Sequence, residues 1–189
     1  MKKIVILFFT FCILFEATAQ SNDDILPPLD RSPMDMCYYP NNYPVLRIQD
    51  KANEPHVARV IYSRPQKSGR KIFGGLVEYG KLWRLGANEA TEIEFFRHVK
   101  ISNKKIPKGR YTLYAIANEN SWIIIVNKET DIWGGFKYDP KKDIVRIELP
   151  IEYMDQSVES MAMIFEKSIA GANLIIAWDN IKVSLPIVF

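Results

Sequence analysis

The sequence predicts an all-β protein: a single antiparallel β-sandwich, jelly-roll-like or Ig-like, of about eight to ten strands with a Gly-rich loop insertion. Three observations predict this fold. Apolar and polar residues alternate along much of the chain, helical periodicity is scarce, and short β-rich runs are separated by turn residues. No internal repeat or interdomain linker is present, so we expect one sandwich domain over residues 45–189.

The clearest alternation lies between residues 93 and 101. The apolar residues on one face of this predicted strand are Ile93, Phe95, Val99 and Ile101. The other face is largely polar, which is typical of a strand that packs on a core from one side only. Residues 123–126 are instead continuously apolar, which predicts a strand covered on both faces.

The remaining elements are predicted from the same features. Further strands are expected at residues 45–49, 57–62, 110–117, 122–127, 144–149, 161–165, 174–178 and 182–188. Residues 76–82 are compatible with one or two turns of helix. The side chains expected in the core are Ile93, Phe95, Val99, Leu113, Ile124, Val126, Ile147, Ile175 and Ile187.

The first 19 residues have the features of a cleavable signal peptide. Lys2 and Lys3 precede an apolar stretch at residues 4–15, and Ala17-Thr18-Ala19 matches a cleavage site. A membrane anchor is the alternative, but a spanning helix needs about 20 apolar residues. We therefore expect cleavage after Ala19 and an exported protein, periplasmic or secreted, with no transmembrane anchor after processing.

Residues 20–44 are rich in proline and are predicted to form an extended N-terminal arm. Prolines at this density oppose both a helix and a central strand. The arm contains Cys37, the one cysteine left after processing. A lone cysteine cannot form an intramolecular disulfide, so we interpret it as a small buried or partly buried apolar residue.

Composition argues against several classes of function. The formal net charge is +3, without the basic stripe that nucleic-acid binding requires. Only two histidines are present and no zinc-ligand spacing, so no metal is expected. Phosphate-binding loops, dinucleotide fingerprints and nucleophile elbows are absent from the sequence, and no cofactor is expected.

The Gly-rich insertion at residues 72–91 carries the candidate binding residues. Trp83, Arg84, Asn88 and Glu89 lie within seven positions of one another, and Trp133 stands in a polar turn where its ring could be exposed. Arginine offers a rigid fork of donors, asparagine both donor and acceptor, and tryptophan a stacking face. This set suits a sugar ring or a carboxylate. The alternative is that Arg84 and Glu89 form an ion pair that fixes the loop to the sandwich.

Three functions therefore remain open at this point. The first is a binding module for a small polar or carbohydrate-like ligand. The second is a glycosidase-like, carboxylate-based hydrolase that uses Glu78 or Glu89 with an arginine electrophile, with Asp179 as a further carboxylate in the sequence. The third is a structural or assembly protein without a small-molecule site.

Several runs of the sequence resemble one known family. They include WRLGANEAT at residues 83–91, KGRYTLY at 108–114, WIIIVNKETDIWGGFKYD at 122–139 and AWDNIKVSLPI at 177–187. These runs are similar to the DUF2911 family, whose members are mostly exported proteins of Bacteroidetes-type bacteria. The resemblance covers nearly the whole processed chain and implies export, but the family has no assigned function and implies no catalytic residues.

Overall fold

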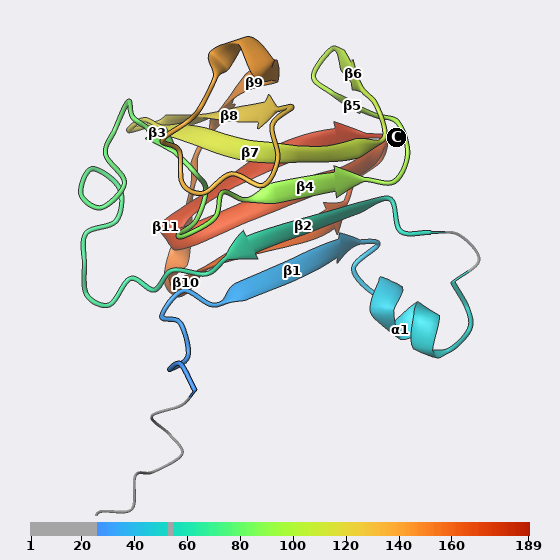
Figure 1. Ribbon diagram of the computed structural model, residues 1–189, viewed down its shortest axis with the longest axis horizontal. Helices are drawn as coiled ribbons and strands as arrows, with labels where there is room; N and C mark the ends of the chain where they lie inside the picture. The colour runs from blue at the N-terminus through green and yellow to red at the C-terminus, as the bar shows by residue number, and fades with distance from the viewer. Residues whose placement is uncertain (1–25, 53–54) are drawn as a thin grey trace, which may run out of the picture.

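The computed structural model describes residues 26–52 and 55–189, so the predicted signal peptide lies outside the described residues. Two antiparallel sheets pack face to face (Figure 1), which confirms the predicted all-β sandwich. The seven-stranded sheet follows the order β1 (Met34–Tyr39), β2 (Ala58–Ser63), β4 (Glu92–Phe95), β7 (Gly109–Ala117), β8 (Ser121–Asn127) and β9 (Asp143–Pro150), with β3 (Leu82–Trp83) pairing beside β7. The four-stranded sheet follows the order β10 (Glu152–Lys167), β11 (Gly171–Val188), β5 (Val99–Ile101) and β6 (Lys104–Ile106).

The core lies between the two sheets, and it contains the predicted side chains with two exceptions. Ile93, Phe95 and Leu113 of the larger sheet are fully inaccessible to solvent. Ile175 of the smaller sheet is buried but is not among the residues of this core. Ile147 is only half-buried. It lies on β9, the outermost strand of the larger sheet, where no further strand shields its side.

The prediction that residues 123–126 form a strand covered on both faces is confirmed. Ile124 and Val126 face the core between the sheets, whereas Ile125 packs with Tyr114 in a second cluster on the outer face. Ile132 and Tyr138, from the connection between β8 and β9, pack against this second cluster. The outer face of the larger sheet is therefore partly closed by that connection.

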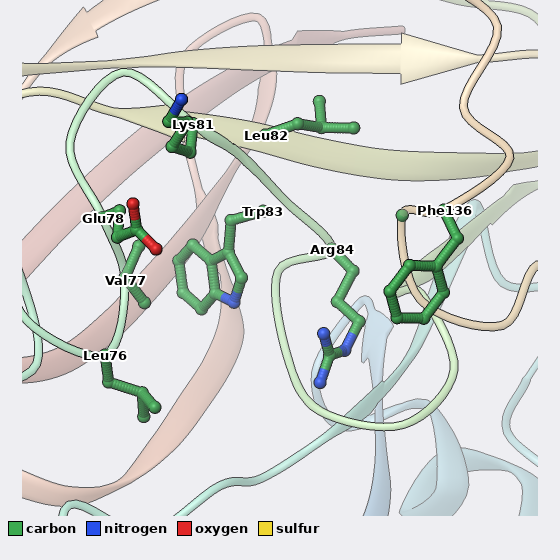
Figure 2. A pocket seen from close by; sticks show the side chains of 9 residues that line it. Leu76, Val77, Glu78, Lys81, Leu82, Trp83, Arg84 and Phe136 are labelled. Atoms are coloured by element: carbon green, nitrogen blue, oxygen red, sulfur yellow. The ribbon is translucent and has the colours of Figure 1, made fainter.

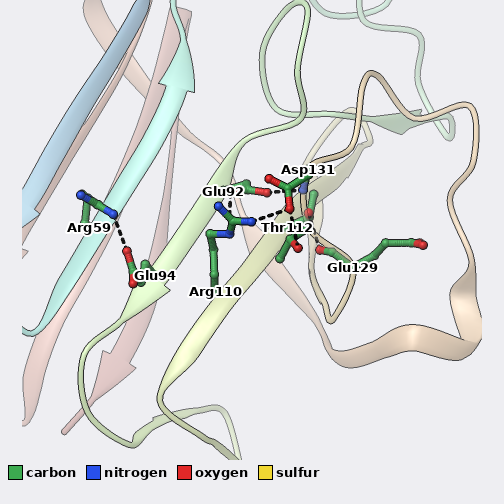
Figure 3. A network of polar contacts seen from close by, with 8 residues as sticks. Arg59, Glu92, Glu94, Arg110, Thr112, Glu129 and Asp131 are labelled. Atoms are coloured by element: carbon green, nitrogen blue, oxygen red, sulfur yellow. Dashed lines mark hydrogen bonds and ion pairs between the residues drawn. The ribbon is translucent and has the colours of Figure 1, made fainter.

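Ion pairs hold the same connection on the sheet (Figure 3). Arg110 of β7 contacts Glu92 of β4 at 3.2 Å and Asp131 of the connection at 2.5 Å. The hydroxyl of Thr112 donates to the carbonyl oxygen of Glu129 at 2.6 Å. These contacts fix the start of the loop that later contributes to the candidate site.

The predicted strand at 93–101 is two strands in different sheets. β4 ends at Phe95, and β5 begins at Val99 in the opposite sheet. The apolar alternation continues across the crossing because the inner faces of both sheets border one core. Periodicity therefore identified the buried residues but not the change of sheet.

The prediction of a strand at 45–49 is wrong, because these residues lie in helix α1 (Tyr43–Ile48). The amide of Leu46 donates to the carbonyl of Asn42 at 3.0 Å, and that of Gln49 to Val45 at 3.1 Å. Pro44 occupies the first turn, where its fixed φ favours a helix and its missing N–H costs nothing. The helix buries none of its residues, so the β-branched residues here have no sheet to join. A second short helical segment, a 3₁₀ turn, lies at Pro140–Lys142. Residues 76–81 form no helix, and Leu82 begins β3.

Part of the predicted arm joins the sandwich. β1 pairs antiparallel with β2 at the edge of the larger sheet, between Pro33 and Pro40. Prolines at the ends of an edge strand remove no ladder hydrogen bond. Cys37 of β1 is half-buried and packs against the core. No described helix is long and apolar enough to cross a membrane.

β11 contains both predicted strands at 174–178 and 182–188. The amide of Phe189 donates to the carbonyl oxygen of Ala170 at 3.2 Å, so the two ends of β11 lie together. The reversal falls near Asp179, whose φ of 53° is in the left-handed region.

Candidate functional site

The Gly-rich insertion is anchored to the core by Trp83. Its ring lies 5.5 Å from that of Trp122, 6.2 Å from Phe73 and 6.0 Å, in a stacked arrangement, from Trp178. Its indole N–H donates to the carbonyl oxygen of Gly86 at 3.2 Å. Trp83 is only 8% exposed, so it is a core residue that also borders the cavities described next, rather than a free stacking platform.

The loop after Trp83 is held in place because its backbone approaches β2 closely. A Cβ on Gly86 would lie 2.7 Å from the hydroxyl oxygen of Ser63, which is too close for any other residue type without a shift. That hydroxyl donates to the carbonyl of Ala87 at 2.5 Å and accepts from the amide of Ala87 at 2.6 Å. The hydroxyl of Thr91 donates to the carbonyl of Leu85 at 2.6 Å. Because Leu85 is fully buried, the backbone on both sides of Arg84 is held in place.

Two adjacent cavities border Trp83 and Arg84. Their volumes are about 300 and 250 Å³, and they share Leu76, Val77, Trp83 and Arg84 in their walls. Figure 2 shows the larger cavity, in which the Arg84 guanidinium lies between the Trp83 and Phe136 side chains. The remaining lining residues of the larger cavity are Glu78, Lys81, Leu82, Gly135 and Phe136; those of the smaller are Ser32, Pro65, Arg70, Gly86, Ala87 and Trp178.

Arg84 is electrostatically unusual. Its Nε is buried and has no hydrogen-bond partner in the described part of the chain. Burial also lowers the pKa of the guanidinium, because removal from water disfavours the charged form. The ion pairs found among residues 26–52 and 55–189 do not include Arg84.

The alternative ion pair between Arg84 and Glu89 is therefore not formed. Glu89 is exposed, and its backbone forms an isolated antiparallel bridge with Trp133. The same two loops are joined by hydrogen bonds from Gly134 to Asn88 at 3.0 Å and from Ala90 to Ile132 at 2.9 Å. Main-chain pairing, rather than a charge pair, holds this end of the insertion.

The predicted site residues therefore separate into two groups. Trp83 and Arg84 line the cavities. Asn88, Glu89 and Trp133 lie in the adjoining loop pair, where the Asn88 amide donates to the Asp30 carboxylate at 3.2 Å. The Trp133 ring is 63% exposed, but it is not part of either cavity wall.

Phe136 is not among the predicted site residues, yet it forms a wall of the larger cavity. Its ring is 86% exposed and lies over Gly134, where a Cβ would be 2.7 Å from the ring carbon Cε2. Gly134 has a φ of +70°, which favours glycine. The Gly-Gly-Phe run after Trp133 was the available signal. Lys81, Arg70 and Leu76 were also missed, because only the three-dimensional arrangement brings them together.

The carboxylates of the proposed hydrolase are not gathered here. Glu78 is the one carboxylate in the two cavity walls as described. Asp179 instead contacts Lys67 at 2.6 Å and Ser157 at 2.8 Å. Burial opposes its ionisation, but these hydrogen bonds outweigh burial and lower its pKa. No group of three metal-ligating side chains occurs among the described residues.

A family sequence pattern described as "Protein of unknown function (DUF2911)" matches residues 45–187. The chain belongs to the DUF2911 family. The match confirms the resemblance seen in the sequence and spans the insertion, the loop carrying Phe136 and the two strands of the closing hairpin. Neither a curated protein nor a solved structure shows significant similarity to this DUF2911 member.

Proposed function

We propose that this DUF2911 protein is an exported, periplasmic or secreted binding module for a small polar or carbohydrate-like ligand. The ligand occupies the paired cavities at Trp83 and Arg84. One observation carries the proposal: the buried Nε of Arg84 has no partner among the described residues, in the wall that both cavities share.

An unpaired buried donor is costly for a folded protein. Leaving such a group unsatisfied costs about 1–3 kcal/mol, and more for a charged group. Most buried polar groups are paired, so an exception requires a physical explanation. The Arg84 side chain also lines both cavities, so a ligand acceptor that enters them can hydrogen-bond to its guanidinium. Groups retained for a ligand are commonly not optimised for folding.

The remaining cavity walls support a ligand that is polar on some sides and apolar on one. Phe136 and Leu76 present exposed apolar surface, whereas Glu78 and Lys81 present hydrogen-bonding groups. A sugar ring combines a face of C–H groups with a rim of hydroxyls and matches both kinds of wall. The larger cavity, at about 300 Å³, is at the small end of the usual range for ligand sites.

The hydrolase receives less support from the same geometry. Glycosidases place two carboxyl groups about 5–10 Å apart across the scissile bond. The described cavity walls supply Glu78 alone, and Glu89 lies outside them. An assembly role would leave both the cavities and the unpaired donor unexplained.

A glycan panel tests the proposal. The chain from residue 20 is titrated with oligosaccharides by isothermal calorimetry, together with Arg84→Gln and the control variant Arg97→Gln. Arg97 is exposed and lies outside both cavities. We expect at least one saccharide to bind wild type and Arg97→Gln equally and Arg84→Gln at least tenfold more weakly. Absence of binding across the panel, or equal binding by both variants, would refute the proposal.

A further inference from the structure

The two cavities carry an excess of positive charge. Arg70, Lys81 and Arg84 line them, and Glu78 is the one carboxylate in their described walls. None of these four groups takes part in the ion pairs found among residues 26–52 and 55–189. The excess is therefore not neutralised by neighbouring acids in that part of the chain. A groove with one dominant sign of charge attracts ligands of the opposite sign.

Arg70 is held in place by the backbone rather than by an acid. Its Nε donates to the carbonyl of Lys67 at 3.0 Å, and its Nη2 donates to that of Gln66 at 2.5 Å. Carbonyl oxygens orient the guanidinium without cancelling its net charge. Arg70 therefore contributes a fixed positive charge at the smaller cavity.

Arg84 has the geometry for a carboxylate. A guanidinium presents its donors in one plane and pairs with carboxylates through two parallel hydrogen bonds. The Arg84 guanidinium is in none of the ion pairs found among the described residues, its buried Nε has no hydrogen-bond partner there, and Phe136 lines the same cavity (Figure 2). A ligand in this cavity therefore meets both a cation and an aromatic side chain.

We propose that the ligand is an acidic sugar of the uronate class, with its carboxylate on Arg84 and its ring against Phe136. This inference rests on the proposed function and names the ligand class for that site. An inorganic anion would satisfy Arg84 but leave the 86% exposed Phe136 ring without a partner. A neutral sugar would contact Phe136 but leave the cationic excess unpaired. A uronate matches both features.

Matched ligands test the inference. Galacturonate and glucuronate oligosaccharides are compared by calorimetry with the neutral galactose and glucose oligosaccharides of equal length, and with the uronate methyl esters. We expect the acids to bind at least tenfold more tightly than both neutral sets, because hydrogen bonds to charged groups are the stronger ones. The preference should weaken as salt is raised from 50 to 300 mM.

Two variants identify the side chains that are responsible for the preference for acidic sugars. Arg84→Gln should reduce the affinity for the acids to that for the neutral sugars. Phe136→Ala should weaken the binding of acidic and neutral sugars by a similar factor and leave the preference for the acids unchanged. Thermal unfolding of both variants verifies that they are folded, and Arg97→Gln serves as the unaffected control.

The outcomes separate the two proposals. Neutral sugars that bind as tightly as the acids would overturn the uronate inference and leave the binding module standing. Sulfate or phosphate that competes as strongly as the uronates would also overturn it, because the sugar ring would then contribute nothing. If no sugar binds, acidic or neutral, the proposed function itself would be overturned.

Discussion

Replacing Arg84 with methionine should stabilise the protein while abolishing ligand binding. Methionine keeps an unbranched, flexible stem that fills the same space, and it removes the charged head. The variant therefore removes the buried, unpartnered Nε without opening a large cavity. A substitution that improves folding at the expense of binding is the expected property of a functional group.

The expected gain in the free energy of unfolding follows from the burial of that unpartnered donor. A buried donor without a partner costs about 1–3 kcal/mol. Arg84 is half-buried, and the rest of its guanidinium reaches the cavities. We therefore use the low end of this range and expect a gain of about 1 kcal/mol in the free energy of unfolding. No ion pair with a described residue is lost, so no compensating penalty is expected.

Urea unfolding followed by tryptophan fluorescence measures the effect. The matched control is Arg97→Met, because Arg97 is exposed and lies outside both cavities. A surface substitution of this kind should change the free energy of unfolding by less than about 0.5 kcal/mol. A loss of 2 kcal/mol or more in Arg84→Met would show that the guanidinium is a structural clamp and would refute the reasoning.

Four further predictions concern the rest of the chain. Phe95→Ala should cost about 3–5 kcal/mol in urea unfolding, because the ring is fully buried; a loss below about 1 kcal/mol would contradict its place in the core. Cys37→Ser should still fold, and the wild-type thiol should react with a disulfide reagent at pH 8 only on unfolding, since burial and the charge of Asp35 raise the pKa of Cys37 to about 12. Asp179 has a lowered pKa in the folded state, so its stabilisation should be fully present above its ordinary pKa of 3.8 and should be lost as the pH falls through the folded-state pKa. The unfolding midpoints of wild type and Asp179→Asn should therefore differ at pH 6 and approach each other as the pH falls below 3.8, and a constant difference would argue against the linkage. Mass spectrometry of the processed protein should find Gln20 as the first residue, and an intact Met1 would exclude the predicted cleavage.

The sequence predicted most of the strands because burial in a sandwich leaves a period of two. This signal is strong where one face meets the core, as at Ile93 and Phe95, and it does not depend on which sheet a strand joins. For the same reason it could not place the crossing between β4 and β5. The residues of helix α1 include β-branched side chains, which favour a strand in the sequence pattern, whereas Pro44 in the first turn favours the helix that forms.

The site was predictable only in part. Residues close together in the sequence, such as Trp83 and Arg84, could be identified from the crowding of chemically capable side chains. Phe136 lies about fifty positions away and reaches the cavity because the connection after β8 folds back over the sheet. Main-chain pairing between that connection and the insertion brings them together, and main-chain pairing leaves little trace in the identity of side chains.

Consecutive positions in the insertion explain how one cationic side chain comes to be fixed at a cavity. Neighbouring residues of an extended segment point to opposite sides, so burial of Trp83 directs Arg84 away from the core. Leu85 is buried in turn; its backbone φ is 52°, and its carbonyl accepts a hydrogen bond from the hydroxyl of Thr91. Because Leu85 is anchored in this way, the backbone at Arg84 is held at the cavities. Arg84 thus stands between two anchored residues, with its backbone ordered before any ligand arrives. Preorganisation of this kind lowers the entropic cost of binding, which allows a small cavity to retain a small ligand.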